Sequence, residues 1–312
     1  MTLAPIVLFV YNRPKHTRQV LEELARNELA NLSTLYIYAD GPKKDASPTQ
    51  IEAIQETRKV IRENQWCGQV KIQENDQNSG LSKSIIQGVT EVINLTGRVI
   101  VLEDDILTSP YFLRYMNDAL ELFQHRMDIG SVNGFAVDFL KNEGFPPYFL
   151  LESSDCWGWA TWKSRWDAYT PNALLLKNTL IEQNKLGIFE YGGHMEILNG
   201  QINGVFDTWD VQWHAVNVLQ NRKGIYANVS FVDNIGQDGS GVHYNVKTEL
   251  EHKRSELNNY RITLPQFVSG QPLTHSKKIE QKYRKYYKLS FTPPLIKRVV
   301  NKLKRTIKRL IK

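Results

Sequence analysis

Cysteine is scarce in this sequence, and its scarcity excludes two classes of small protein. Only Cys67 and Cys156 occur among the 312 residues, which is too few for a disulfide framework and lacks the paired spacing of a zinc finger. Both are expected to be small buried hydrophobic residues. The chain must therefore fold around an apolar core, and its length, with 41% hydrophobic residues, suffices for one large domain or two small ones.

Long hydrophobic runs are absent as well. The apolar start at 1–11 has no basic flank and is too short to cross a bilayer, and no other segment reaches a spanning length. We therefore expect a protein that is made and kept in a reducing cytoplasm. The chain also lacks the Gly-x-Gly-x-x-Gly pattern of dinucleotide-binding folds and the P-loop, which argues against a dehydrogenase or an NTPase of those types.

Strand and helix patterns alternate through the first third of the chain. Short apolar runs typical of buried strands are followed by amphipathic stretches typical of helices. The strands are expected at 5–10, 35–39, 70–73 and 97–102, and the helices between them at 14–28, 47–64 and 81–93. With right-handed crossovers, this order predicts a mostly parallel sheet flanked by helices, which is the α/β fold class.

The pattern changes after about residue 130. Shorter strands are expected at 131–138, 147–151 and 225–232, and helices at 174–199 and 206–221. Trp159, Trp162 and Trp166 recur at helical spacing, which predicts a helix packed against the sheet. The Trp157-Gly158-Trp159 segment allows a second interpretation, because a glycine between aromatic residues suits close approach by a sugar ring.

Three acids end the strand expected at 97–102. Glu103–Asp105 follow its apolar run directly, and like charges so close together repel one another. A divalent metal held by oxygen ligands relieves that repulsion; the alternative is a solvated acidic loop. Ser109 and Pro110 then predict the start of a helix, as its N-cap and its first residue.

Polar residues follow the other expected strands of this sheet too. Asn12 and Arg13 come after the first strand, Asp40 after the second, and Asn78 and Gly80 after the third. The carboxyl ends of parallel strands meet at one edge of the sheet, where ligands bind in open α/β folds. We therefore expect these side chains and the three acids to share one site.

Several of these motifs resemble those of GT-A-fold nucleotide-sugar glycosyltransferases, especially inverting ones. V-I-V-L-E-D-D-I-L-T-S-P-Y-F (99–112) is similar to the acidic metal motif of the N-acetylglucosaminyltransferases that initiate complex N-glycans, and T-W-D-V-Q-W (208–213) to their segment with the catalytic base. N-S-G-L-S-K (78–83) resembles a segment of family-2 bacterial transferases. The resemblance covers roughly 4–245 and implies a GT-A (Rossmann-like) fold. The chain departs from the Golgi enzymes in lacking an N-terminal membrane anchor, which favours a bacterial-type cytoplasmic enzyme.

The resemblance also implies roles for single residues. Mn²⁺ or Mg²⁺ is expected to be coordinated by Asp105, and His243 resembles a histidine that joins the metal or the diphosphate. Asp40 matches the acid that contacts uracil in such enzymes. The residues expected to bind the nucleotide-sugar are Arg13, Asp40, Asn78, Gly80, Lys83, Glu103, Asp104, Gly158 and Trp159.

The acceptor hydroxyl needs a general base, usually a carboxylate in an inverting enzyme. Asp210 is the expected base, and Asp207 is the second candidate. Each assignment has a plainer alternative: Asp210 as a solvated or helix-capping carboxylate, His243 as a structural histidine, and Asp40-Gly41-Pro42 as an ordinary turn.

The tail has the opposite charge to the body. Ser276–Lys312 holds 14 lysines and arginines against one acid, Glu280, a net charge of +13; since the whole chain carries +6, the rest carries −7. Residues 295–312 place apolar side chains on one helical face and basic ones on the other, which is typical of binding to an anionic membrane surface. Tyr283, Tyr286 and Tyr287 are expected to add interfacial contacts. A helix docked on the body is the alternative, and no nucleic-acid partner is expected.

The sequence therefore predicts a glycosyltransferase domain at 1–275, with a nucleotide-binding half at 1–130 and an acceptor-binding half at 131–275, and a basic membrane-associating tail at 276–312. The expected reaction is inverting, metal-dependent transfer from a nucleotide-diphosphate sugar, UDP-linked first of all. The expected acceptor is a membrane-associated or lipid-linked glycan of bacterial surface polysaccharide synthesis, reached from the inner face of the plasma membrane.

Two other functions stay open at this point. A sugar-nucleotide nucleotidyltransferase also needs acids at a strand end, but its Gly-rich, basic signature is missing at 10–14. A non-catalytic, membrane-bound sugar-binding module is the second alternative, and the presence of both Asp105 and Asp210 argues against it.

Overall fold

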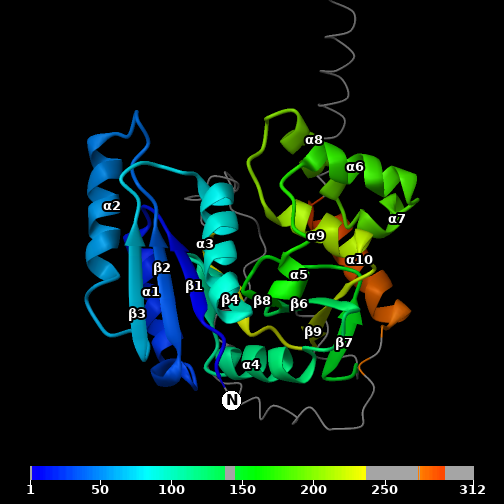
Figure 1. The fold of residues 1–312 in the computed structure, drawn as a ribbon, viewed down its shortest axis with the longest axis horizontal. Coiled ribbons are helices and arrows are strands. Elements are labelled where there is room, and N and C mark those ends of the chain that lie inside the picture. Colours follow the sequence, from blue (N-terminus) through cyan, green and yellow to red (C-terminus); the bar gives the residue numbers. More distant parts are fainter. Residues whose placement is uncertain (1, 138–144, 237–272, 274, 292–312) are drawn as a thin grey trace, which may run out of the picture.

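An eight-stranded mixed sheet forms the centre of the computed structural model, which describes residues 2–137, 145–236, 273 and 275–291. The strand order is β3-β2-β1-β4-β8-β6-β9-β7 (Figure 1), and β8 and β7 run against the other six strands. The strands are β1 (Ile6–Val10), β2 (Thr34–Ala39), β3 (Gln69–Glu74), β4 (Arg98–Glu103), β6 (Ile129–Asn133), β7 (Tyr148–Leu151), β8 (Trp159–Trp162) and β9 (Lys223–Ala227). Two short strands, β5 (Ile106–Thr108) and β10 (Val232–Asn234), pair antiparallel in a second sheet.

Helices cover both faces of the large sheet (Figure 1). Successive strand side chains point to opposite faces, so Leu8 enters one hydrophobic core and its neighbours Val7 and Phe9 enter the other. The first core includes α1 (Pro14–Ala25), the short helix η1 (Ala30–Leu32), α2 (Pro48–Val60), α4 (Phe112–Leu122) and α10 (Lys277–Phe291). The second includes α3 (Leu81–Thr96), α5 (Lys163–Trp166), α6 (Ala173–Glu182), α7 (Leu186–Phe189), α8 (His194–Ile202) and α9 (Asp210–Leu219). The predicted fold class, α/β with a mostly parallel sheet flanked by helices, is confirmed.

The tryptophan-rich segment forms a strand where its spacing predicted a helix. β8 lies between β4 and β6 and pairs antiparallel with both, Trp159 opposite Val101 and Ala160 opposite Val132. Trp159 therefore faces the second core and Trp162 the first. The prediction of a helix was wrong because a separation of three residues also fits two rings on opposite faces of one strand.

Several boundaries in the second half differ from the prediction. The stretch 174–199 contains three helices, because the backbone turns left-handed at Asn184 (φ 53°) and at Gly193 (φ 129°). The helix predicted at 206–221 begins only at Asp210. The strand predicted at 225–232 is divided between β9 and β10.

The helix after the acidic stretch begins at Phe112, two residues later than Pro110 predicted. The backbone N–H of Ser109 donates to the carbonyl of Phe231 at 2.8 Å, and Thr108 pairs with Val232. These residues belong to the β5–β10 sheet and its continuation, so the helix starts beyond them.

Within the described ranges, none of the helices has the length and apolar character that crossing a bilayer requires.

Candidate functional site

Arg13 and the acids after β4 form one cluster at the carboxyl edge of the sheet. Nη2 of Arg13, which follows β1, pairs with Oδ1 of Asp104 and lies 3.0 Å from Oδ2 of Asp105. The parallel pairing of β1 with β4 brings the two strand ends together, with Phe9 opposite Glu103. The structure therefore brings these predicted site residues together, as the strand order required.

The cluster carries more negative charge than Arg13 neutralises. Burial, and then the charges of Asp105, Asp104 and Asp210, raise the pKa of Glu103 well above its usual value. Burial also raises the pKa of Asp105, although Arg13 works in the opposite direction. Asp210, in the first turn of α9, therefore adds its charge to those that act on Glu103. Such a group of acids favours a bound cation.

The donor chemistry of the cluster fits a hard divalent cation that is held together with a phosphate. Carboxylate oxygens are the ligands that Mg²⁺ and Mn²⁺ prefer. Among the residues that the structure describes, no group of three or more His, Cys, Asp or Glu side chains is arranged to hold a metal by itself. Mg²⁺ is commonly bound through one or two carboxylates together with substrate phosphates and water. Asp105, with Asp104 beside it, therefore suits a metal that binds with a diphosphate.

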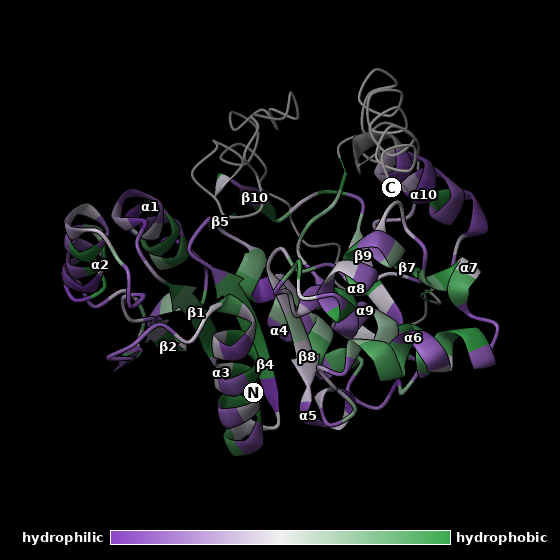
Figure 2. Cartoon of the chain, turned by 90° about the horizontal axis from the view of Figure 1, so that it is seen from above, coloured by the Kyte–Doolittle hydropathy of each residue, from purple (hydrophilic) through white to green (hydrophobic). Residues whose placement is uncertain are grey.

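The chain returns to this cluster after β10, which lies beside β5 (Figure 2). The N–H of Ile235 donates to the carbonyl of Asp105 at 2.9 Å. A Cβ at Gly236 would collide with Oδ2 of Asp105 and lie 3.1 Å from Nη1 of Arg13. A glycine at this position therefore lets the backbone pass directly against the acidic cluster.

Asp40 organises the loop between β3 and α3. Its Oδ1 accepts hydrogen bonds from the N–H groups of Gly41 and Ser79, both at 2.9 Å, and its Oδ2 accepts from the side chain of Asn78 at 2.8 Å and from the N–H of Gly80 at 3.1 Å. Asn78 and Gly80 therefore reach the edge as parts of a loop that Asp40 holds in place. A contact between Asp40 and a nucleotide base stays a proposal.

Replacing Asp40 with alanine is expected to lower the free energy of unfolding by about 2–4 kcal/mol, because several donors of the loop lose their acceptor. Urea denaturation measures this change. Asp76→Ala is the matched control, since Asp76 is an exposed carboxylate in the same loop. Equal stability of the two variants would contradict the assigned role of Asp40.

Asp207 and Asp210 come to this edge on the segment that leads into α9. Oδ2 of Asp207 lies 3.3 Å from the position that a Cβ would take at Gly80, whose φ is +83°. Asp210 is in the first turn of α9, and its Oδ1 accepts a hydrogen bond from the hydroxyl of Thr208. Asp207 thus lies against the loop at Gly80, and Asp210 is the candidate base whose charge acts on Glu103.

The charges of the candidate site also act on Asp155 and Cys156, which no pattern in the sequence assigns to a site. Burial, with a contribution from Asp210, raises the pKa of Asp155 to about 6. Burial and then the charges of Asp210, Asp155 and Glu103 raise the pKa of the Cys156 thiol well above its usual value. Neither residue belongs to a recognisable motif, and only the tertiary fold brings them here.

Gly158 and Trp159 belong to the packing of the fold. Trp159 has no exposed surface, and its ring lies 5.1 Å from that of Trp209. Gly158 has a φ of +62°, and a Cβ there would lie 2.8 Å from Cγ1 of Val232. Core packing explains the tryptophan, and the positive φ with the close approach of Val232 explains the glycine. The expected contact of these two residues with a donor sugar does not fit their placement.

The remaining predicted residues are Lys83 and His243. Lys83 lies exposed in the first turn of α3, three residues after Gly80. His243 lies outside the described residues, and its expected contact with the metal or the diphosphate stays a prediction.

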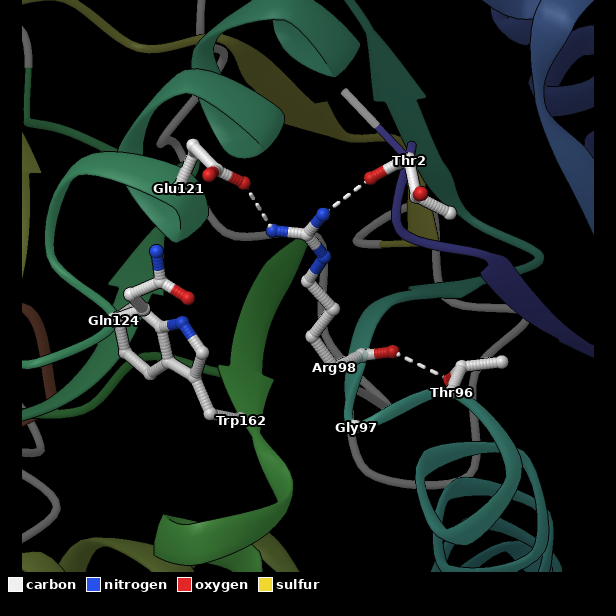
Figure 3. A pocket seen from close by; sticks show the side chains of 7 residues that line it. All are labelled: Thr2, Thr96, Gly97, Arg98, Glu121, Gln124 and Trp162. Carbon is white, nitrogen blue, oxygen red and sulfur yellow. Dashed lines mark hydrogen bonds and ion pairs between the residues drawn. The ribbon is translucent and has the colours of Figure 1, made fainter.

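A hollow of about 420 Å³ lies at the opposite, amino edge of β4 (Figure 3). Arg98 at its centre donates to Glu121 at 2.8 Å and to the carbonyl of Thr2, and the indole N–H of Trp162 donates to the carbonyl of Leu120. The charged and donor groups of this hollow are therefore engaged with the protein itself.

No protein-family model and no curated protein matches the sequence. Among solved structures, the S. aureus TarS 1-349 structure has 9% sequence identity and a TM-score of 0.38, with 75% of this chain and 61% of that chain covered. The galactosyltransferase LgtC in complex with donor and acceptor sugar analogs has 10% identity and a TM-score of 0.34, with 94% and 99% covered. UDP-glucose pyrophosphorylase complexed with UDP-glucose has 11% identity and a TM-score of 0.33, with 72% and 90% covered. At these low values, the case for a function rests on the residues of this chain.

Proposed function

We propose that this chain is an inverting, metal-dependent glycosyltransferase that uses a nucleotide-diphosphate sugar, with UDP as the first nucleotide to test. The observation that carries the proposal is the meeting of two acidic groups at one sheet edge. One is Glu103–Asp105 with Arg13, and the other is Asp210 on α9, whose charge acts on Glu103. Sugar transfer needs both, because the diphosphate leaves as an anion and the acceptor hydroxyl must lose a proton.

The β4 acids and Arg13 form the proposed donor side. Asp105 is the proposed ligand of Mn²⁺ or Mg²⁺, and a divalent metal bound there supplies positive charge to the departing diphosphate. Arg13 supplies a fixed positive charge at the same place. Glu103 and Asp104 are the proposed acceptors of hydrogen bonds from hydroxyls of the ribose or the donor sugar.

The loop held by Asp40 closes the donor side. Asn78 and Gly80 place backbone and amide groups at the sheet edge, where they are proposed to contact the nucleotide. Lys83, exposed at the start of α3, is proposed to reach the base or the diphosphate.

Asp210 is the proposed general base. It takes the proton of the acceptor hydroxyl while the hydroxyl oxygen bonds to the anomeric carbon of the donor sugar. The bond from that carbon to the diphosphate oxygen breaks, and its electron pair leaves with the nucleotide. A single displacement of this kind inverts the anomeric configuration. The hydroxyl of Thr208 orients the Asp210 carboxylate by donating to Oδ1.

The proposed acceptor is a membrane-associated or lipid-linked glycan, as in bacterial surface polysaccharide synthesis. Support comes from the sequence of 295–312, whose basic and apolar faces suit the anionic inner face of a plasma membrane. These residues lie outside the described part of the chain.

A donor screen tests the proposed activity. The purified protein is incubated with a panel of nucleotide-sugars, either with Mn²⁺ or with EDTA, and the release of nucleoside diphosphate is measured. We expect one donor to be hydrolysed at least about tenfold faster with Mn²⁺, which corresponds to about 1.4 kcal/mol of barrier. Absence of both hydrolysis and binding for every donor would overturn the proposal. Formation of a nucleotide-sugar from a nucleoside triphosphate and a sugar phosphate would indicate a nucleotidyltransferase instead.

A further inference from the structure

The C-terminal helix α10 docks on the body of the protein. Ile279 and Tyr283 have no exposed surface and belong to the first core. Tyr287 donates its hydroxyl to Oδ2 of Asp155 at 2.7 Å. The predicted contacts of Tyr283 and Tyr287 with a membrane interface are therefore replaced by contacts within the protein. Much of the helix is hydrophilic (Figure 2), and its exposed residues include Lys277, Lys278, Lys285 and Lys288.

Charged groups of α10 hold the corner between α7 and α8. Arg284 donates to the carbonyls of Ile188 at 2.9 Å and of Glu190 at 2.8 Å, and also to Glu280 of its own helix at 2.9 Å. Glu280 in turn accepts a hydrogen bond from the hydroxyl of Tyr191. Glu280 is buried and Arg284 is half-buried. Because charged groups that share several hydrogen bonds away from water are costly to separate, this corner and α10 form one unit.

This corner leads directly to the candidate site. A Cβ at Gly192 would lie 2.8 Å from the carbonyl carbon of Tyr287, so the corner packs tightly against α10. His194, two residues later, is close enough to Asp210 for that charge to act on its pKa, although burial dominates and lowers it.

A second connection runs through Asp155. Besides the hydroxyl of Tyr287, its carboxylate accepts a hydrogen bond from the N–H of Trp157 at 2.9 Å, and its own N–H donates to Oδ1 of Asn133 at 2.9 Å. These bonds fix the segment 155–158 at the end of β6. Cys156 in this segment feels the charges of Asp210 and Glu103.

We infer that α10 is a positioning element of the candidate site, and that the Tyr287–Asp155 hydrogen bond holds the segment 155–158 in place beside Asp210. Tyr287 and Asp155 are thus positioning residues, and only their effect on turnover rests on the proposed function. The order of the segment 155–158 is measurable without any substrate.

The reactivity of Cys156 tests the structural part. Cys67→Ala removes the other cysteine, so that a thiol reagent reports on Cys156 alone. The wild-type thiol is expected to react slowly, because burial and nearby acids disfavour the thiolate. Tyr287→Phe removes one hydroxyl and is expected to raise the labelling rate at least about tenfold, the factor for a fall of one unit in the thiol pKa. Tyr286→Phe, one residue earlier on α10, is the matched control with the unchanged rate.

Turnover of the donor identified by the screen tests the effect on the site. Tyr287→Phe is expected to lower kcat about tenfold or more and to leave KM for the donor unchanged, because Asp155 and Cys156 of this segment interact electrostatically with the proposed base Asp210. Tyr286→Phe should keep both values. A general loss of stability would instead lower the fraction of folded protein, which thermal melting detects.

The pH profile adds a readout that a purely structural role would not move. The titratable groups that act on Asp155 are Cys156 in its own segment, Asp210 of α9, Tyr226 of β9, and Tyr283 and Tyr287 of α10. The hydrogen bond from Tyr287 favours ionised Asp155, whose pKa is raised by burial to about 6. Without the hydroxyl the pKa of Asp155 rises. The part of the kcat profile that reports ionisation of Asp155, as distinct from the base Asp210, should therefore move to higher pH in Tyr287→Phe.

A wild-type labelling rate for Cys156 in Tyr287→Phe would overturn the inference. If this variant does not fold, Asp155→Asn replaces it, because asparagine keeps the shape but offers one oxygen to two donors. Faster labelling without turnover in any protein, wild type included, would contradict the proposed function and leave the positioning role standing. Turnover by the wild type, together with a labelling rate that Tyr287→Phe does not change, would support the proposed function and contradict the positioning role.

Discussion

Asp210→Asn is expected to reduce the kcat of sugar transfer by about 100- to 10,000-fold, the usual contribution of a general base. Asparagine keeps the size of the side chain and can still accept the hydrogen bond from Thr208, but it cannot take a proton from the acceptor hydroxyl. KM for the donor should stay the same, because the donor side is formed by the β4 acids and Arg13. Steady-state rates with the donor found in the screen, and water or a glycan as acceptor, measure both constants.

Asp207→Asn is the matched control for this prediction. Asp207 lies three residues earlier and contacts the loop at Gly80 rather than standing in the first turn of α9. We expect this variant to keep most of its kcat. The opposite pattern, a lost kcat in Asp207→Asn and a normal one in Asp210→Asn, would transfer the role of base to Asp207.

Asp105→Asn is expected to abolish the coupling between metal and nucleotide. Mg²⁺ is commonly bound through one or two carboxylates together with substrate phosphates, so the metal and the diphosphate should complete each other's site. Coupling of this kind usually amounts to about 1–3 kcal/mol, or 5- to 150-fold in affinity, and it is reciprocal. Calorimetric titration of UDP with Mn²⁺ and with EDTA measures it. In the variant the two titrations should give the same affinity.

Asp128→Asn is the control for the loss of one carboxylate. Asp128 is exposed and pairs with Arg126 just before β6, at the amino edge of the sheet. Full coupling is expected in this variant. If Asp105→Asn retained the coupling as well, Asp105 would not be the metal ligand, and Asp104 or a residue outside the described ranges would take its place.

The first half of the fold followed from the sequence because its signals are local. An apolar run such as Ile6–Val10 and the stop at Glu103 each mark a buried strand and its end without reference to the rest of the chain. The order of parallel strands then placed Arg13 beside the β4 acids. β8 could not be found in this way, because its strand character depends on the two neighbours, β4 and β6, that it joins.

The residues of the candidate site were also predictable only where the signal is local in the sequence. Acids at strand ends and Asp210 in a short motif were visible in the sequence, whereas the hydrogen bond of Asp155 with Tyr287 joins residues that are 132 positions apart. The basic composition of 276–312 suggested a separate tail, yet α10 is part of the body. Trp159 was predicted to contact a donor sugar, but it lies in the second core. The sequence could not distinguish the two roles, because clustered aromatic residues occur both in cores and in sugar-binding sites.

The central claim is that a nucleotide diphosphate and a divalent metal bind together at the edge where Asp105 meets Arg13. The titration of wild-type protein with UDP, in Mn²⁺ and in EDTA, tests this claim most directly. We predict measurable binding whose affinity is at least about fivefold higher with Mn²⁺, the lower end of usual coupling. Equal affinity in the two titrations, or no binding of UDP in either, would contradict it.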